Sequence, residues 1–97
     1  MQTYVFLTRF TEQGIENVRE SPARTAEAME MVESLGGTWE AFFVTMGRYD
    51  GLVVAEFPDD EAAARAALAL GRGGNVTTET LRAFTLEEFG DLVEAMP

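Results

Sequence analysis

Tyr49 and Asp50 are the residues whose side chains could most readily act on a small molecule. They lie in Gly47-Arg48-Tyr49-Asp50-Gly51, with apolar runs on both sides, which predicts a hairpin turn near the middle of the chain. A phenol and a carboxylate at the mouth of a pocket could orient a ligand through hydrogen bonds. The alternative is structural: Asp50 would bond backbone N–H groups of the turn, and Tyr49 would pack its ring against a neighbouring strand.

Glu56 and Arg82 form a second candidate cluster, to which Arg9 and Glu40 could contribute. Glu56 interrupts an otherwise apolar strand, and a buried carboxylate needs a cationic partner such as a guanidinium. One interpretation is a salt bridge that fixes the register of a dimer. The other is a polar spot in an apolar cavity, a typical small-ligand site, with Trp39 as a lining residue. Core packing is the alternative for Trp39, as for the other aromatic residues of the strands.

The composition excludes more chemistry than any motif adds. The 97 residues include no histidine and no cysteine, so the commonest general base, thiol nucleophiles and thiolate metal sites are missing. All basic residues are arginines, so no lysine can form a Schiff base. The net charge of −10 opposes binding to nucleic acid or to an anionic membrane. The sequence therefore predicts no metal site, no cofactor, no nucleic-acid partner and no membrane association, and a cytoplasmic location is expected.

The pattern of apolar residues predicts four strands and three main helices within one domain of residues 1–97. Ser21-Pro22 predicts the start of the first helix, and Gly36-Gly37 predicts its end. An alanine-rich helix follows an aspartate cap at Asp59 or Asp60. The strands are expected at 3–10, 38–46, 51–57 and 75–85, and the helices at 21–35, from 59 or 60 to about 70, and at 86–96.

This order predicts an α+β fold of the ferredoxin-like βαββαβ type, with a four-stranded antiparallel sheet and a C-terminal helix. The helices at 21–35 and from 59 or 60 to about 70 cover one face of the sheet. Val53, Ala55 and Phe57 should face them, as should Leu81 and Ala83. The opposite, open face is expected to carry two groups of residues. They are Leu52, Val54 and Glu56 of the third strand, and Val76, Thr78, Thr80, Arg82 and Phe84 of the fourth. Because an exposed apolar face of that size is rare in a monomer, the sequence predicts a homodimer with the two sheets face to face.

The chain resembles the GYD-domain proteins, which are named for a Gly-x-Tyr-Asp turn that stands here at Gly47-Arg48-Tyr49-Asp50. Shorter similarities lie in order along nearly the whole chain, among them Leu35-Gly36-Gly37 and Gly74-Asn75-Val76. The resemblance implies a dimeric α+β barrel. That superfamily includes cofactor-free monooxygenases, isomerases, haem enzymes and ligand-sensing domains, so the resemblance supports the fold more than any one function.

Three functions are compatible with these observations. The first is a homo-oligomeric barrel that binds or senses a small ligand through Tyr49, Asp50, Glu56, Arg82, Trp39 and Arg9. The second is a cofactor-free monooxygenase or isomerase acting on small aromatic or lactone-like compounds. The third is a structural or interaction protein without a ligand. The absence of histidine weakens the enzyme hypothesis, because a histidine base and a histidine-ligated haem are both excluded.

Overall fold

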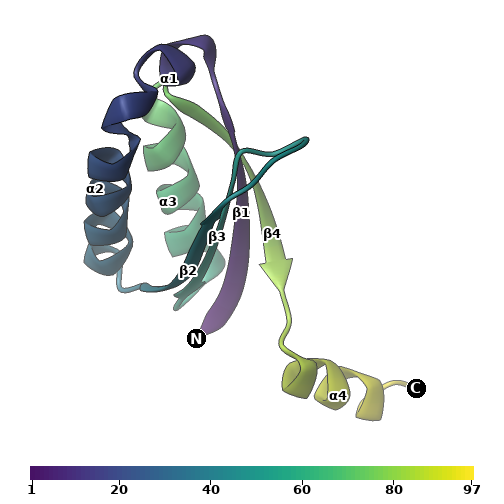
Figure 1. The fold of residues 1–97 in the computed structure, drawn as a ribbon. Coiled ribbons are helices and arrows are strands. Elements are labelled where there is room, and N and C mark those ends of the chain that lie inside the picture. Colours follow the sequence, from purple (N-terminus) through teal and green to yellow (C-terminus); the bar gives the residue numbers. More distant parts are fainter.

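Strand β1 (Gln2–Phe10) is one of the two inner strands of the sheet and pairs with a strand on each side, as the computed structural model of residues 1–97 shows (Figure 1). Strand order is β2-β3-β1-β4, and every pair is antiparallel. The remaining elements are α1 (Glu12–Glu16), a 3₁₀ turn (Val18–Glu20), α2 (Ser21–Ser34), β2 (Thr38–Val44), β3 (Gly51–Phe57), α3 (Asp60–Arg72), β4 (Val76–Ala83) and α4 (Leu86–Glu94). The predicted ferredoxin-like α+β fold is confirmed.

Helices α2 and α3 lie side by side on one face of the sheet, and α4 stands away from the rest of the molecule (Figure 1). The chain therefore forms one sheet layer and one helix layer, with a separate C-terminal helix at the end of β4. The face of the sheet that α2 and α3 cover is called the helix face below, and the other is called the open face. None of the helices is long and apolar enough to span a membrane.

The core is built from aromatic side chains of the sheet and small side chains of α3. Phe57 makes edge-to-face contacts with Tyr4 and Phe6, with ring centroids 5.9 and 6.0 Å apart. The alanines of α3 let the helix backbone approach these rings closely, because no longer side chain stands between them. The fully buried set is Tyr4, Phe6, Val32, Val53, Ala55, Phe57, Ala62, Ala63 and Ala66. The alternation predicted for β3 is confirmed, since Val53, Ala55 and Phe57 are buried on the helix face.

The facing predicted for β4 is wrong by one residue. Tyr4 lies opposite both Ala55 and Arg82, so Arg82 is on the helix face. Thr3 lies opposite both Glu56 and Ala83, so these two residues share the open face. Register is specified by an apolar face, and β4 offers none: both of its alternating sets mix threonine with charged and apolar residues.

Both predicted helix starts are confirmed, at Ser21 for α2 and directly after Asp59 for α3, but only the aspartate acts as a cap. Asp59 caps α3, with its Oδ1 accepting a hydrogen bond of 2.8 Å from the Ala62 N–H. Ser21 does not cap α2: its hydroxyl accepts a hydrogen bond from Arg24 Nη2 instead, and the helix follows directly from the 3₁₀ turn. The residues before Ser21 are already helical, so its hydroxyl is not needed as a cap. It serves as a hydrogen-bond partner for Arg24 instead.

Short helix α1 docks on the loop between α3 and β4. The Thr11 hydroxyl oxygen accepts from the Gly14 N–H at 3.0 Å, which caps α1. Thr11 also donates from its backbone N–H to the Asn75 carbonyl at 3.0 Å and from its hydroxyl to the Gly74 carbonyl at 2.6 Å. This close approach needs a glycine, because a Cβ on Gly14 would lie 2.0 Å from the Asn75 oxygen.

Gly14→Ala should therefore destabilise the fold, by about 2 kcal/mol or more, because α1 must move away from the loop and lose its hydrogen bonds. Gly71→Ala is the matched control: it lies in α3, and its added Cβ would meet nothing within 4 Å. That change should stabilise the chain by up to about 1 kcal/mol through helix propensity. Urea unfolding midpoints of both variants test the pair. Equal midpoints would contradict the close contact at Gly14.

Candidate functional site

The hairpin between β2 and β3 is closed by hydrogen bonds within the Gly-x-Tyr-Asp turn. Thr45 donates from its backbone N–H to the Asp50 carbonyl at 2.9 Å and from its hydroxyl to the Tyr49 carbonyl at 2.6 Å. Gly47 has a φ of 108°, in the region that residues with a Cβ rarely adopt. The first glycine of the motif is thus required by the backbone of the turn.

Asp50 joins this hairpin to β1. Its carboxylate Oδ2 accepts a hydrogen bond of 2.9 Å from the Phe10 N–H, and its own N–H donates to the Thr8 carbonyl at 2.8 Å. Asp50 directly precedes β3, so these two bonds extend the pairing between β1 and β3 by one residue beyond Gly51. Asp50 thus bonds a backbone N–H group, as the structural alternative expected, but that group belongs to β1 and not to the turn.

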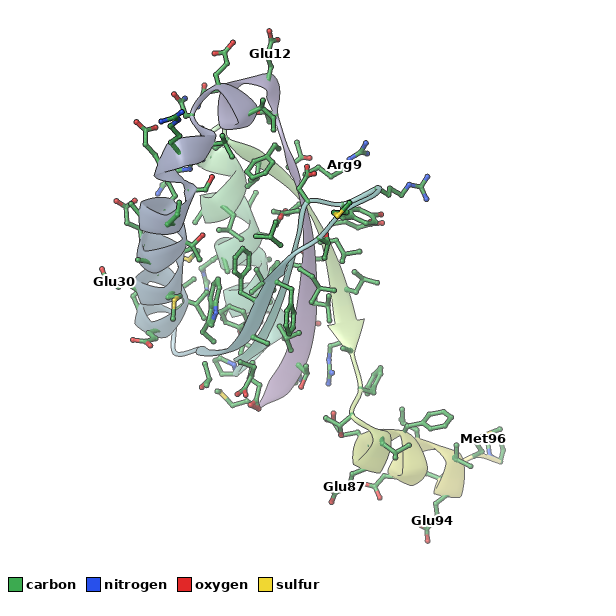
Figure 2. All side chains as sticks on the ribbon, in the orientation of Figure 1. Arg9, Glu12, Glu30, Glu87, Glu94 and Met96 are labelled. Atoms are coloured by element: carbon green, nitrogen blue, oxygen red, sulfur yellow. The ribbon has the colours of Figure 1, made fainter.

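Tyr49 lies on the other side of the sheet from Asp50. Its hydroxyl donates to the carboxylate of Glu79 in β4, and this bond is the main reason why the pKa of Tyr49 is raised. Arg9 lies beside the hairpin, on the side of the sheet away from α2 (Figure 2). A shallow hollow of about 410 Å³ is lined there by Leu7, Arg9, Arg48, Tyr49, Thr77, Thr78 and Glu79. Because the phenol of Tyr49 and the carboxylate of Asp50 line different surfaces, they do not form one site.

Glu56 and Arg82 do not pair, which corrects the prediction of a shared cluster. They lie on opposite faces of the sheet, as the registers through Thr3 and Tyr4 require. The neighbour of Glu56 is Glu40, an extra residue at a β-bulge in β2. A hydrogen bond to Glu56, followed by burial and the charge of Glu56, raises the pKa of the Glu40 carboxyl. The polar spot on the open face is therefore a pair of carboxyl groups.

Arg82 belongs to a structural cluster around Tyr4. Its guanidinium carbon lies 5.6 Å from the centroid of the Tyr4 ring and 4.4 Å from that of Phe84. The Tyr4 hydroxyl contacts Gln2 Oε1 at 2.6 Å and donates to the carboxylate of Asp60 at the start of α3. Burial and the hydrogen bond to Asp60, in that order, raise the pKa of Tyr4 to about 12.

A cavity of about 660 Å³ lies between the helix face and helices α2 and α3. Trp39 and Asp50 both line it, so the structure brings together two of the six residues that the sequence proposed. The other lining residues were missed from the sequence, because Phe42 was assigned to the core with the other strand aromatics and no motif pointed to the rest. The further residues that define its walls and floor are Thr8, Phe10, Met31, Phe42, Gly51 and Val53.

One signal in the sequence could have located this cavity. Thr8 and Gly51 lie opposite each other on the helix face. The next pair on the same face, Phe6 and Val53, is larger and buried. Two small residues in one row leave a hollow when helices cover the face. Reading the row required the register, which pattern analysis of single strands does not give.

The topology and the two helices on one face define a ferredoxin-like α+β protein. Residues 4–93 match the family model of the GYD domain, so the chain belongs to the GYD-domain family. It is 33% identical over 89 residues to a Thermus thermophilus protein named "Glutamine synthetase and cystathionine beta-lyase binding protein", covering 91% of this chain and 94% of that protein. No solved structure matches the chain.

The raised pKa of Tyr4 predicts a loss of stability in alkali. Tyrosine in an unfolded chain ionises near pH 10, whereas Tyr4 in the fold ionises near 12. Its contribution is therefore complete below pH 10 and is lost as the pH rises to about 12, a difference of about 3 kcal/mol in unfolding free energy. Urea unfolding across this range measures it, and no lysine is present to complicate the titration.

Two variants assign this alkaline loss to one residue. Tyr4→Phe should remove most of the pH dependence between 10 and 12, because no phenol remains at the buried position. Tyr49→Phe is the control and should retain most of it, because the pKa of Tyr49 is raised by Glu79 at an exposed site, where solvent screens the interaction. An unchanged alkaline slope in Tyr4→Phe would contradict the assignment.

Proposed function

We propose that this chain is a homo-oligomeric binding protein, in which a second copy covers the open face and the assembled oligomer binds other proteins. The observation that carries the proposal is the apolar character of the open face. One row across all four strands, Ala41-Val54-Val5-Leu81, contains no polar side chain. The adjacent row, Phe43-Leu52-Leu7-Glu79, contains one. Leu81 is 43% exposed and Phe43 is 60% exposed in the single chain.

The size of the open face favours a partner that also contacts α4. Four strands about 4.8 Å apart and seven residues long, with a rise of about 3.3 Å each, give a flat area of roughly 440 Å². A stable interface buries about 800 Å² on each partner. The sheet face supplies the centre of such an interface, and a further element must supply the remainder.

Helix α4 is that further element. It has nine residues, and Thr85 and Glu88 form a reciprocal capping box at its start. No residue of α4 is buried, although Leu86, Phe89 and Val93 form an apolar stripe and are 84%, 57% and 49% exposed. An isolated helix of this length is marginal in water. We infer that α4 packs its apolar stripe against the second copy, because it extends away from its own chain (Figures 1 and 2).

The relative from Thermus thermophilus supports the part of the proposal that concerns other proteins. Its name says that it binds glutamine synthetase and cystathionine beta-lyase, and the similarity extends over nearly the whole of both chains. We propose that the present chain binds a glutamine synthetase, a cystathionine beta-lyase or both, in the cytoplasm. The hypothesis of a cofactor-free enzyme is weaker, because Tyr49 and Asp50 line different surfaces and do not form one site.

Leu81→Lys should convert the oligomer to a monomer. The charge would lie in the centre of the apolar row, and burying it without a partner costs several kcal/mol. The monomer should stay folded, because Leu81 is already 43% exposed there. Leu68→Lys is the matched control, on a leucine of α3 that is 74% exposed. Light scattering coupled to size exclusion gives the mass of each variant. A monomeric wild type, or a dimeric Leu81→Lys, contradicts the proposed interface.

Binding to partner enzymes is tested with purified glutamine synthetase and cystathionine beta-lyase from the same organism as this chain. Immobilised wild-type protein should bind at least one of them saturably, with a dissociation constant in the micromolar range or below, as for specific protein complexes. Bovine albumin, an acidic protein without this relationship, is the control. Failure to bind either enzyme while the oligomer is intact contradicts the partner assignment and leaves the self-association result independent of it.

A further inference from the structure

The cavity between the helix face and helices α2 and α3 has a physical cause in the placement of the core. The buried side chains of the sheet come from the first half of β1 and from β3 beyond Leu52. In the other half of β1, Thr8 and Phe10 are only half-buried, and Gly51 opposite Thr8 has no side chain. The two helices continue over this half, so a hollow of about 660 Å³ remains beneath them.

The walls of this cavity are apolar and aromatic. Trp39 and Phe42 lie with ring centroids 6.1 Å apart at an angle of 47°, and Phe10 and Met31 contribute further apolar surface. Phe42 remains 36% exposed although it is on the face that the helices cover. A volume of this size and lining is typical of sites for small organic molecules. The walls therefore favour a ligand with a ring-sized apolar body.

One charged group at the cavity is held in place without a cationic partner. Asp50 Oδ2 is fixed by the Phe10 N–H, and no arginine forms an ion pair with the carboxylate. Arg24 also lines the cavity, but it donates to the Asn17 carbonyl and to the Ser21 hydroxyl and lies 3.7 Å from Glu20. Glu27 and Arg72 are exposed members of the lining. Among the half-buried polar groups of the lining, the carboxylate of Asp50 and the hydroxyl of Thr8 are thus left to meet a ligand, while Glu27 and Arg72 face solvent.

We propose that this cavity binds a small aromatic amine, with its ring between Trp39, Phe42 and Phe10 and its ammonium group on the Asp50 carboxylate. A protonated amine supplies both the donor and the charge that Asp50 lacks. An aromatic acid of the same size would meet the carboxylate with like charge and is rejected. This site goes beyond protein binding, does not require it, and lies on the opposite side of the sheet from the proposed dimer interface.

Trp39 is the only tryptophan of the chain, so its fluorescence reports directly on the cavity. The probe is 2-phenylethylamine, compared with phenylacetate, which has the same ring and the opposite charge. The amine should change the Trp39 emission saturably, and phenylacetate should bind roughly tenfold more weakly or not at all. Equal binding of the two probes, or no saturable change with either, overturns the proposal.

Two variants assign the roles of the carboxylate and of the hollow. Asp50→Asn keeps an oxygen that can accept from the Phe10 N–H, and it should weaken amine binding by roughly tenfold while removing the discrimination against phenylacetate. Asp91→Asn, on the exposed helix α4, is the matched control and should bind like wild type. Ala28→Phe adds a ring from α2 into the hollow and should abolish binding of the amine without lowering the melting temperature. Unchanged affinity in Asp50→Asn or in Ala28→Phe contradicts the assignment.

Discussion

The pairing register of β1 is the constraint on which the rest of the structure depends. Because β1 is bonded on both sides, its pleat determines which face each residue of β3 and β4 occupies. Glu56 and Ala83 pair with Thr3 and therefore lie with it on the open face. Ala55 and Arg82 pair with Tyr4 and lie on the helix face. The core, the cavity and the apolar open face are all consequences of this one alternation.

Fold and element order could be predicted from the sequence because they depend on strong local signals. The bounds of β3 were predicted correctly because Gly51 opens the apolar run and Pro58 ends it, and its buried face because Val53, Ala55 and Phe57 are wholly apolar whereas the other face carries Glu56. The GYD motif, the glycine pair after α2 and the aspartate before α3 each have a local physical cause. Such signals do not require knowledge of any distant residue.

The grouping of site residues could not be predicted in the same way, because it depends on register. The threonine-rich β4 has no apolar face, so its sequence pattern does not distinguish between two registers that differ by one residue. A shift of one residue moves Arg82 to the other face of the sheet. Tyr49 and Asp50 are adjacent in sequence, and adjacency in an extended chain places side chains on opposite sides. The structure therefore places the two candidate groups apart: the carboxylate of Asp50 lines the cavity, and the phenol of Tyr49 is bonded to Glu79.

The sheet is a single layer that separates two different environments. Val53 borders the cavity, and its neighbours Leu52 and Val54 lie on the open face, where the second copy is proposed. A systematic substitution scan along β3 should consequently give two interleaved phenotypes with a period of two residues. Odd-numbered positions would alter the interior under the helices, and even-numbered positions would alter self-association.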